Sequence, residues 1–153
     1  FKIDGQIIKS TAIRYELKNG DYSLAKRALG YNYLISGKII HGHGIGKTLG
    51  YPTINLAVPA GKLLPKQGVY SAKAGIDGTK YDGMAYIGER LTFDDTSLVV
   101  EINLFDFKNE PKFDHAAIEL IDYIRPPEKF ETSAKLVEKI KSDELEIKKR
   151  FKY

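Results

Sequence analysis

The stretch HGHGIGKTLGYPTIN, residues 41–55, holds the densest group of residues that could bind phosphate. Gly46–Thr48 matches the end of a Walker A loop, in which backbone amides and a lysine hold nucleotide phosphates. The preceding glycine, Gly42, leaves a spacer that is one residue short, and Gly50 and Pro52 stand where the helix of such a loop would continue. The stretch is therefore not a Walker A loop.

The residues after these glycines indicate a different kind of phosphate site. Pro52 favours extended backbone, so the Thr53 hydroxyl and the Asn55 amide, two residues apart, are expected to point the same way. Such oxygen ligands suit a magnesium ion held mainly by substrate phosphates. Preceding backbone amides could form an anion nest beside the point charge of Lys47; the glycines that free them are Gly42, Gly44 and Gly46. A glycine-rich turn followed by an ordinary strand would use much the same residues, so both interpretations stay open.

Glu101 is a candidate general base within the run LVVEINLF, residues 98–105. Alternation with period two assigns one set of residues to the core face and the other to the opposite face. The core set is Leu98, Val100, Ile102 and Leu104, and the opposite set is Val99, Glu101, Asn103 and Phe105. If the opposite face lines a pocket, Glu101 can take a proton from a hydroxyl nucleophile. If that face is wet, Glu101 is an ordinary solvent-facing glutamate.

The histidines and aromatic residues carry less information. His41 and His43 have no third ligand nearby and are expected to be turn or surface residues, while His115 begins a strand. The aromatic residues in the second half of the chain are expected mostly in the core, with one or two available to wall a flat ligand. They are Tyr70, Tyr81, Tyr86, Phe93, Phe105, Phe107 and Tyr123.

Short strands must position these groups, because turn residues divide the chain after Tyr33 into short β-like runs. The strands are expected near residues 33–41, 68–76, 80–87, 97–107 and 115–124, with a hairpin turn at Asp77-Gly78. Several antiparallel strands at this spacing favour a barrel or a sandwich.

Helices are expected on both sides of these strands. Residues 10–30 predict two short helices, the first capped by Ser10 or Thr11 and stopped by a left-handed Gly20, the second capped by Asp21 and stopped by Gly30. One long helix is expected from a cap near Thr132 to the end of the chain. Its apolar stripe, which should pack on the barrel, consists of Leu136, Ile140, Ile147 and Phe151.

Composition limits the class of protein. A chain of 153 residues with 42% hydrophobic residues fits one domain with a sizeable core and a short appendage. The absence of cysteine excludes disulfides and thiolate chemistry and is compatible with the cytoplasm. No run is long and apolar enough to span a bilayer, so no membrane partner is expected. The net charge of +4 comes largely from the last helix, which favours a solvated face over a nucleic-acid surface.

Five segments, in order and at similar spacing, resemble the riboflavin kinase (flavokinase) module. They are GKIIHGHGIGKTLGYPTINL, LPKQGVYSAK, DGMAYIGERLTF, VEINLFDF and IRPPEKF, covering roughly residues 33–150. The Gly-x-Pro-Thr-x-Asn signature at Gly50–Asn55 is the specific part of this resemblance. The segment IIKSTAIRYELKNGD resembles the end of the adenylyltransferase domain of bifunctional bacterial FAD synthetases. The resemblance thus implies a helical remnant of that domain at residues 1–31, with Ser10, Thr11 and Arg14 serving its nucleotide site, and a kinase domain at residues 32–153.

The resemblance implies a mainly β fold, a six-stranded antiparallel Greek-key barrel with a long C-terminal helix and a short helical N-terminal segment. It implies transfer of the ATP γ-phosphate to the 5′-hydroxyl of riboflavin, giving FMN and ADP, with Mg²⁺ accompanying ATP. Glu101 would be the base, and Thr53 and Asn55 would hold magnesium and phosphate oxygens. The loop with Gly42, Gly44, Gly46 and Lys47 would hold phosphate, and the flavin contacts would be Asn103, Leu104, Arg125 and Phe130.

The chain departs from the family pattern at three places. Asn103 stands where the family often has histidine, Leu91 where it has proline, and residues 109–113 replace the usual ending of the next loop. These departures leave the catalytic residues in place and affect the flavin site. A non-catalytic barrel that binds flavin, nucleotide or oligonucleotide is the competing interpretation.

Overall fold

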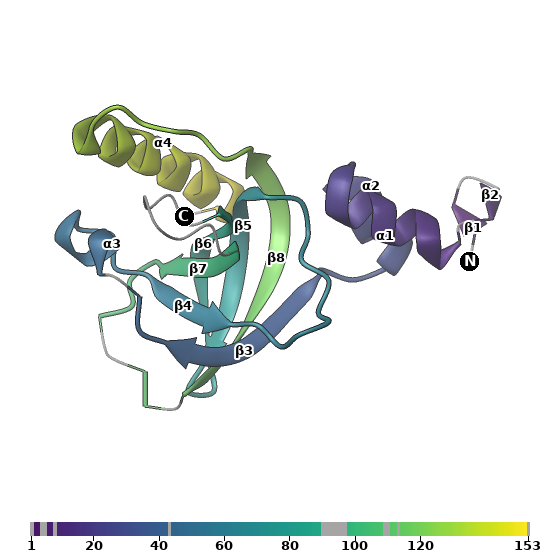
Figure 1. The fold of residues 1–153 in the computed structure, drawn as a ribbon, viewed down its shortest axis with the longest axis horizontal. Helices are drawn as coiled ribbons and strands as arrows, with labels where there is room; N and C mark the ends of the chain where they lie inside the picture. The colour runs from purple at the N-terminus through teal and green to yellow at the C-terminus, as the bar shows by residue number, and fades with distance from the viewer. Residues whose placement is uncertain are drawn as a thin grey trace.

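Six strands form a closed antiparallel barrel in a computed structural model that describes residues 2–3, 6–7, 9–42, 44–89, 98–108, 111–112 and 114–152. The strands are β3 (Leu34–Ile40), β4 (Ile54–Ala57), β5 (Gly68–Ile76), β6 (Thr79–Glu89), β7 (Leu98–Leu104) and β8 (His115–Arg125). Their order around the barrel is β3-β4-β7-β6-β5-β8, and β8 pairs again with β3 (Figure 1). Because β4 lies beside β7 rather than β5, the arrangement is a Greek key.

Five of these strands lie where the residue pattern predicts them, and β5 has the predicted bounds. The hairpin turn after it is also confirmed: Asp77 and Gly78 both have positive φ values, 51° and 79°, which a two-residue turn of this kind requires. The sixth strand, β4, was anticipated only as extended chain after Pro52, since four residues are too short to show alternation.

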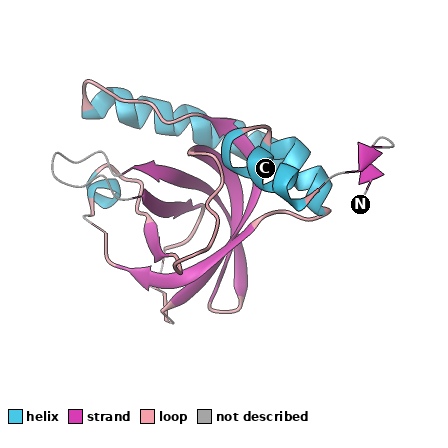
Figure 2. Ribbon diagram, turned by 45° about the vertical axis from the view of Figure 1, so that its right-hand side comes forward, coloured by secondary structure: helices cyan, strands magenta, loops and turns pink. Residues whose placement is uncertain are grey.

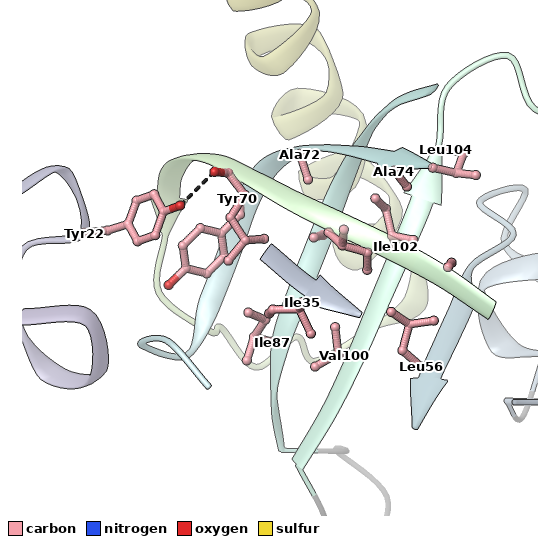
Figure 3. Packing of buried hydrophobic residues seen from close by; sticks show 14 of the residues in the cluster. Tyr22, Ile35, Leu56, Tyr70, Ala72, Ala74, Ile87, Val100, Ile102 and Leu104 are labelled. Carbon is pink, nitrogen blue, oxygen red and sulfur yellow. Dashed lines mark hydrogen bonds between the residues drawn. The ribbon is translucent and has the colours of Figure 1, made fainter. Parts of the chain in front are cut away.

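The barrel is filled by side chains that project inward from all six strands. Alanines on β5, β6 and β8 pack there together with larger isoleucine, leucine and valine side chains (Figure 3). The predicted core face of β7 is confirmed for Val100, Ile102 and Leu104, whereas Leu98 is 51% exposed at the end of the strand. The opposite face of β7 is also largely shielded from solvent, because Val99, Asn103 and Phe105 are buried there.

Helix α4 (Ser133–Phe151) lies across the barrel, as the apolar stripe predicts (Figures 1 and 2). Thr132 caps it by accepting a hydrogen bond from the backbone N–H of Lys135. Ile147 is fully buried. Thus α4 is the element that encloses the outward-facing residues of β7.

Helices α1 (Ser10–Asn19) and α2 (Tyr22–Leu29) form a pair beside β8, and β1 (Lys2–Ile3) and β2 (Gln6–Ile7) form a small hairpin before them (Figure 1). Asp21 caps α2 and a left-handed Gly30 ends it, as expected. Two details of α1 were wrong: Lys9 occupies the cap position without a side-chain bond, and Gly20 has a negative φ of −109°. The Glu16 side chain occupies the space beside Gly20 and accepts a hydrogen bond from the Asp21 N–H.

The helical pair shares the barrel's core rather than having its own. Leu17, Tyr22 and Ala25 belong to the same buried cluster as the strand residues. The Tyr22 hydroxyl donates a hydrogen bond to the Leu120 carbonyl at 2.7 Å, and its ring meets Tyr70 edge to face (Figure 3). The Lys26 ammonium donates to the Ile121 carbonyl on the same strand. In the described part of the chain, no helix is both long and apolar enough to cross a membrane.

Candidate active site

A cavity of about 520 Å³ lies between the outer face of the barrel and α4. Its walls come from the glycine-rich loop, β4, β6, β7, the end of β8 and the first half of α4. A volume of this size is typical of sites for small organic ligands. A more open groove of about 710 Å³ lies beside Gly37 and the Asp77-Gly78 turn, and half of its lining residues are glycine or alanine. Thr53, Asn55 and Glu101 line the first cavity and not the groove.

Strand pairing sets the predicted base opposite the predicted metal ligand. Asn55 of β4 and Glu101 of β7 are direct partners in the antiparallel register, and Tyr86 of β6 is the partner of Glu101 on its other side. Directly opposed residues have Cβ atoms about 5 Å apart and side chains on the same face. Thr53, two residues before Asn55, lines the same cavity. The structure therefore brings Thr53, Asn55 and Glu101 together.

The Asn55 amide oxygen is unusual among the buried polar atoms. Asn55 is 4% exposed, and its Oδ1 is the single buried side-chain nitrogen or oxygen without a hydrogen-bond partner among the described residues. Leaving a buried acceptor unpaired costs about 1–3 kcal/mol, so such atoms call for a functional explanation. An oxygen held in this way beside a hydroxyl and opposite a carboxylate fits the donor set of a magnesium ion.

The glycine-rich loop contains a single turn of helix, α3 (Ile45–Thr48), which ends before Gly50 and Pro52. The longer helix of a Walker A loop is absent from this described segment, as Gly50 and Pro52 predict. Left-handed glycines enclose it, with φ of 72° at Gly44 and 84° at Gly50. The Tyr51 N–H returns to the Gly46 carbonyl at 2.7 Å, which closes the loop immediately before Pro52. The Thr48 hydroxyl donates to the Ile45 carbonyl and so is used within the turn.

Only some of the residues predicted to bind phosphate line the cavity. Gly44 and Gly46 line the cavity, and a side chain at Gly46 would collide with the Tyr51 carbonyl. Gly42 lies against the Asn55 side chain, where any larger residue would displace the amide. Lys47 is exposed and is not part of the described cavity wall.

Three of the four predicted flavin contacts line the cavity, and the fourth does not. Asn103, Arg125 and Phe130 line the cavity, whereas Leu104 lies in the barrel core on the opposite face of β7. The Asn103 Nδ2 donates a hydrogen bond to the Pro52 carbonyl at 2.8 Å. The Arg125 guanidinium stacks over Phe130, with 5.9 Å between its central carbon and the ring centroid.

A buried ion pair joins the end of β8 to α4. The Arg125 Nε donates to the Asp143 carboxylate at 2.8 Å, and the Asp143 side chain is 2% exposed. Lys139 adds a second cation 3.5 Å from Asp143. A buried carboxylate requires such partners, and they hold Arg125 in the cavity wall.

The cavity is electronegative. Five of its described wall residues are carboxylates, Glu89, Glu101, Glu128, Glu131 and Asp143, and one, Arg125, is cationic. Burial raises the pKa of the Tyr86 hydroxyl, and the nearby Glu101 raises it further. Burial, followed by the charge of Glu144 and a hydrogen bond with it, also raises the pKa of Tyr51. Tyrosines at this site therefore stay protonated at neutral pH.

Many of the wall residues were not assigned to the site from the sequence, among them Met84, Tyr86, Val99, Leu136, Ile140 and Asp143. Asp143 carried a usable signal, because it falls between Ile140 and Ile147 on the apolar stripe of its helix. A carboxylate there must be buried with a partner.

Other candidate residues lie elsewhere. Ser10, Thr11 and Arg14 are exposed on α1 and do not line the cavity. His41 is exposed, and the described residues include no cluster of three metal-binding His, Cys, Asp or Glu side chains. His43, Leu91, Phe93, Asn109, Glu110 and Phe113 lie outside the described residues.

Comparison with known sequences points to one family, riboflavin kinase. The family model described as riboflavin kinase (flavokinase) matches residues 29–151. Relatives named bifunctional riboflavin kinase/FMN adenylyltransferase are 37% identical in Listeria monocytogenes and 38% in Bacillus subtilis, each match covering 94% of this chain and 46% of the relative. The Haemophilus influenzae relative of the same name is 36% identical, with 99% and 49% covered. The chain spans about half the length of these curated relatives.

Solved structures share the fold. A Streptococcus pneumoniae chain described as a macrolide-efflux protein has a TM-score of 0.83 and 34% identity, covering 94% of this chain and 47% of that one. The riboflavin kinase of Trypanosoma brucei has a TM-score of 0.54 and 21% identity, covering 80% and 81%; at that identity the likeness concerns the fold alone. The family match spans the whole barrel, α4 and every wall of the cavity. This chain therefore belongs to the riboflavin kinase (flavokinase) family.

Proposed function

We propose that this chain transfers the γ-phosphoryl group of ATP to the 5′-hydroxyl of riboflavin, giving FMN and ADP. The observation that carries the proposal is the pairing of Glu101 with Asn55 in the wall of a ligand-sized cavity, where the buried Asn55 Oδ1 has no hydrogen-bond partner among the residues that the structure describes. Family membership supports the same reaction.

Glu101 acts as the base in this proposal. The riboflavin hydroxyl oxygen forms a bond to the γ-phosphorus, its proton passes to the Glu101 carboxylate, and the bond to the ADP oxygen breaks. Glu101 is half-buried in the middle of β7, and it is paired with a neighbouring strand on each side. A base held in this way mainly orients the nucleophile, which is the larger part of catalysis in phosphoryl transfer.

Thr53 and Asn55 would hold magnesium together with the phosphate oxygens. Their hydroxyl and amide oxygens fit that ion, and the ion's charge would offset that of the transferring phosphoryl group. The electronegative cavity supports this assignment, because a nucleotide polyphosphate would otherwise meet five carboxylates and one arginine among the described wall residues. The amides of Gly44 and Gly46 are available to the phosphates on the adjoining wall, and Lys47 would need to swing inward to contribute.

The flavin would lie against the wall formed by Arg125 and Phe130. Their stacked arrangement offers a flat surface, and the apolar side chains of Val99 and Leu136 belong to the same cavity. The buried position of Leu104 speaks against a side-chain contact with flavin.

Residues 1–31 are proposed to be the end of an FMN adenylyltransferase domain in a longer bifunctional enzyme, followed by the kinase domain at 32–153. The length of the curated relatives and their names support this division. The exposure of Ser10, Thr11 and Arg14 on α1 leaves them available to an upstream nucleotide site.

The decisive experiment is an assay of riboflavin with ATP, with and without Mg²⁺, in which FMN and ADP are separated by chromatography. The expected result is equal amounts of FMN and ADP that depend on magnesium. Flavin binding without FMN formation would leave a flavin-binding barrel, and steeply salt-dependent binding of single-stranded oligonucleotide would favour the nucleic-acid alternative.

A further inference from the structure

The β4–β7 pairing ends where the Gly-x-Pro-Thr-x-Asn signature begins. The last backbone partners on this side are Ile54 and Ile102, so Thr53 and Asn103 occupy the next positions of the register. Pro52 has no N–H to offer to a neighbouring strand. The Pro52 carbonyl instead accepts a hydrogen bond from the Asn103 Nδ2 at 2.8 Å.

We propose that Asn103 is a positioning residue, whose side-chain amide holds Pro52 and Thr53 in line with the strand that carries Glu101. The inference deepens the proposed function and rests on it. Asn103 and Glu101 are two residues apart on one face of β7, and Thr53 and Asn55 are two apart on the neighbouring strand segment. The Asn103–Pro52 bond therefore links the catalytic strand to the metal-side residues one step beyond the last backbone pair.

The environment of the amide fits this role better than direct contact with flavin. Asn103 is 8% exposed, and because a carbonyl only accepts, the nitrogen of its amide must face Pro52. The resemblance to the family placed Asn103 among the flavin contacts, whereas its hydrogen-bond partner lies in the segment that carries Thr53.

The loop on the other side of Pro52 is held as well. The Tyr51 N–H donates to the Gly46 carbonyl at 2.7 Å, so the chain is held just before the proline as well as at the proline carbonyl. With the Asn103 side chain removed, the Pro52 carbonyl loses this bond, and the nearest remaining anchors are the Tyr51 N–H bond before it and the Ile54–Ile102 pair after it. Thr53 then loses its fixed distance from Glu101, and small displacements at reacting centres cost large factors in rate.

Two variants separate this role from a flavin contact. Asn103→Leu keeps the size of the side chain and removes the donor, while Asn103→Asp keeps the shape and sets a carboxylate against the Pro52 carbonyl. Leu98→Ala, at the exposed end of the same strand, is the matched control. The measurements are the KM for Mg-ATP, kcat, and the riboflavin Kd from quenching of flavin fluorescence.

The expected result for both Asn103 variants is a rise of about tenfold or more in the KM for Mg-ATP, with lower kcat and a riboflavin Kd within about twofold of the parent chain. A raised riboflavin Kd with an unchanged KM for Mg-ATP would overturn the inference, as would parent-like values for both constants.

Amide hydrogen exchange at Thr53 and Ile54, followed by NMR, tests the bond without turnover. Faster exchange in Asn103→Leu than in Leu98→Ala supports the inference, and equal exchange contradicts it. If the parent chain forms no FMN, the proposed function fails in the assay while this exchange measurement still reports on the Asn103–Pro52 link.

Discussion

Asn55 and Glu101 face each other across neighbouring antiparallel strands. Asn55 has a buried oxygen without a hydrogen-bond partner in the described part of the chain, and Glu101 places its carboxylate in the cavity wall. The backbone register of the two strands sets this pairing, so a shift of either strand by one residue would separate the two side chains. The register therefore fixes the position of the proposed base, Glu101, relative to the proposed metal-side amide, Asn55.

Replacing Glu101 with glutamine removes the proton acceptor and keeps the size of the side chain. The kcat for FMN formation is expected to fall by about 10²- to 10⁴-fold, the usual contribution of a general base. Single-turnover kinetics and riboflavin titration measure the two effects separately. The riboflavin Kd should stay unchanged, and a variant that retains most of its turnover would exclude Glu101 as the base.

Replacing Asn55 with leucine removes the unpaired Oδ1 while filling a similar volume. Because that oxygen costs about 1–3 kcal/mol when it has no ligand, the melting temperature without ligand is expected to stay equal or rise. The stabilisation of the protein by Mg-ATP should disappear, since the variant has lost its metal-side oxygen. Thermal melts with and without Mg-ATP measure both effects. A large drop in the melting temperature of the free protein would instead make Asn55 a structural residue.

Replacing Gly46 with alanine should open the phosphate loop. The new methyl group would meet the Tyr51 carbonyl, a backbone atom that cannot move without displacing Pro52 and Thr53. The KM for Mg-ATP is expected to rise by about tenfold or more. Gly75→Ala is the matched control, because a methyl group there has no atom within 4 Å and the φ of Gly75 is not positive. Equal kinetics in the two variants would contradict a close-packed loop.

Removing the Asp143 carboxylate should loosen α4 from the barrel. Asp143→Ala leaves the Arg125 guanidinium, 14% exposed, without its main partner. Loss of one partner of such a buried pair lowers the free energy of unfolding by about 3 kcal/mol. Urea denaturation measures this change, and Glu146→Ala, which removes an exposed pair with Arg150 on the same helix, should cost less than about 1 kcal/mol. Similar losses of unfolding free energy in both variants would show that the Arg125–Asp143 pair stabilises the protein no more than an exposed ion pair does.

Alkaline pH should weaken the contact between α2 and the barrel. Burial raises the pKa of the Tyr22 hydroxyl to about 12, above its ordinary value of 10. The folded state then holds this proton more tightly than the unfolded state, so the contribution is complete below pH 10 and is lost as pH rises from 10 to about 12. The loss amounts to about 2–3 kcal/mol from this group.

The pH dependence of urea unfolding between pH 9 and 11.5 measures the effect. Tyr22→Phe is the reference, since it cannot titrate and loses the hydrogen bond to the Leu120 carbonyl at every pH. Its stability curve should be flatter than that of the parent chain above pH 10. Parallel curves would assign the alkaline loss to other groups.

The sequence was most informative where short-range chemistry decides the structure. The Asp77-Gly78 turn, the Asp21 and Thr132 caps and the strand at residues 68–76 could all be located from residue types, because each depends on neighbours within a few positions. The cap of α1 was misplaced because Ser10 and Thr11 are both suitable cap residues, whereas the helix begins at Ser10 itself, with Lys9 in the cap position.

The sequence by itself determined which residues carry the chemistry: Pro52 makes Thr53 and Asn55 face one way, and alternation sets Glu101 and Asn103 together on one face of their strand. Only the tertiary structure decided that these two strands are neighbours, with Asn55 opposite Glu101, and that α4 covers that face and contributes Asp143. The tertiary structure also places Leu104 in the barrel core and Lys47 outside the described cavity wall. The physical reason is that register and packing join residues about fifty to ninety positions apart, and no local preference encodes such pairings.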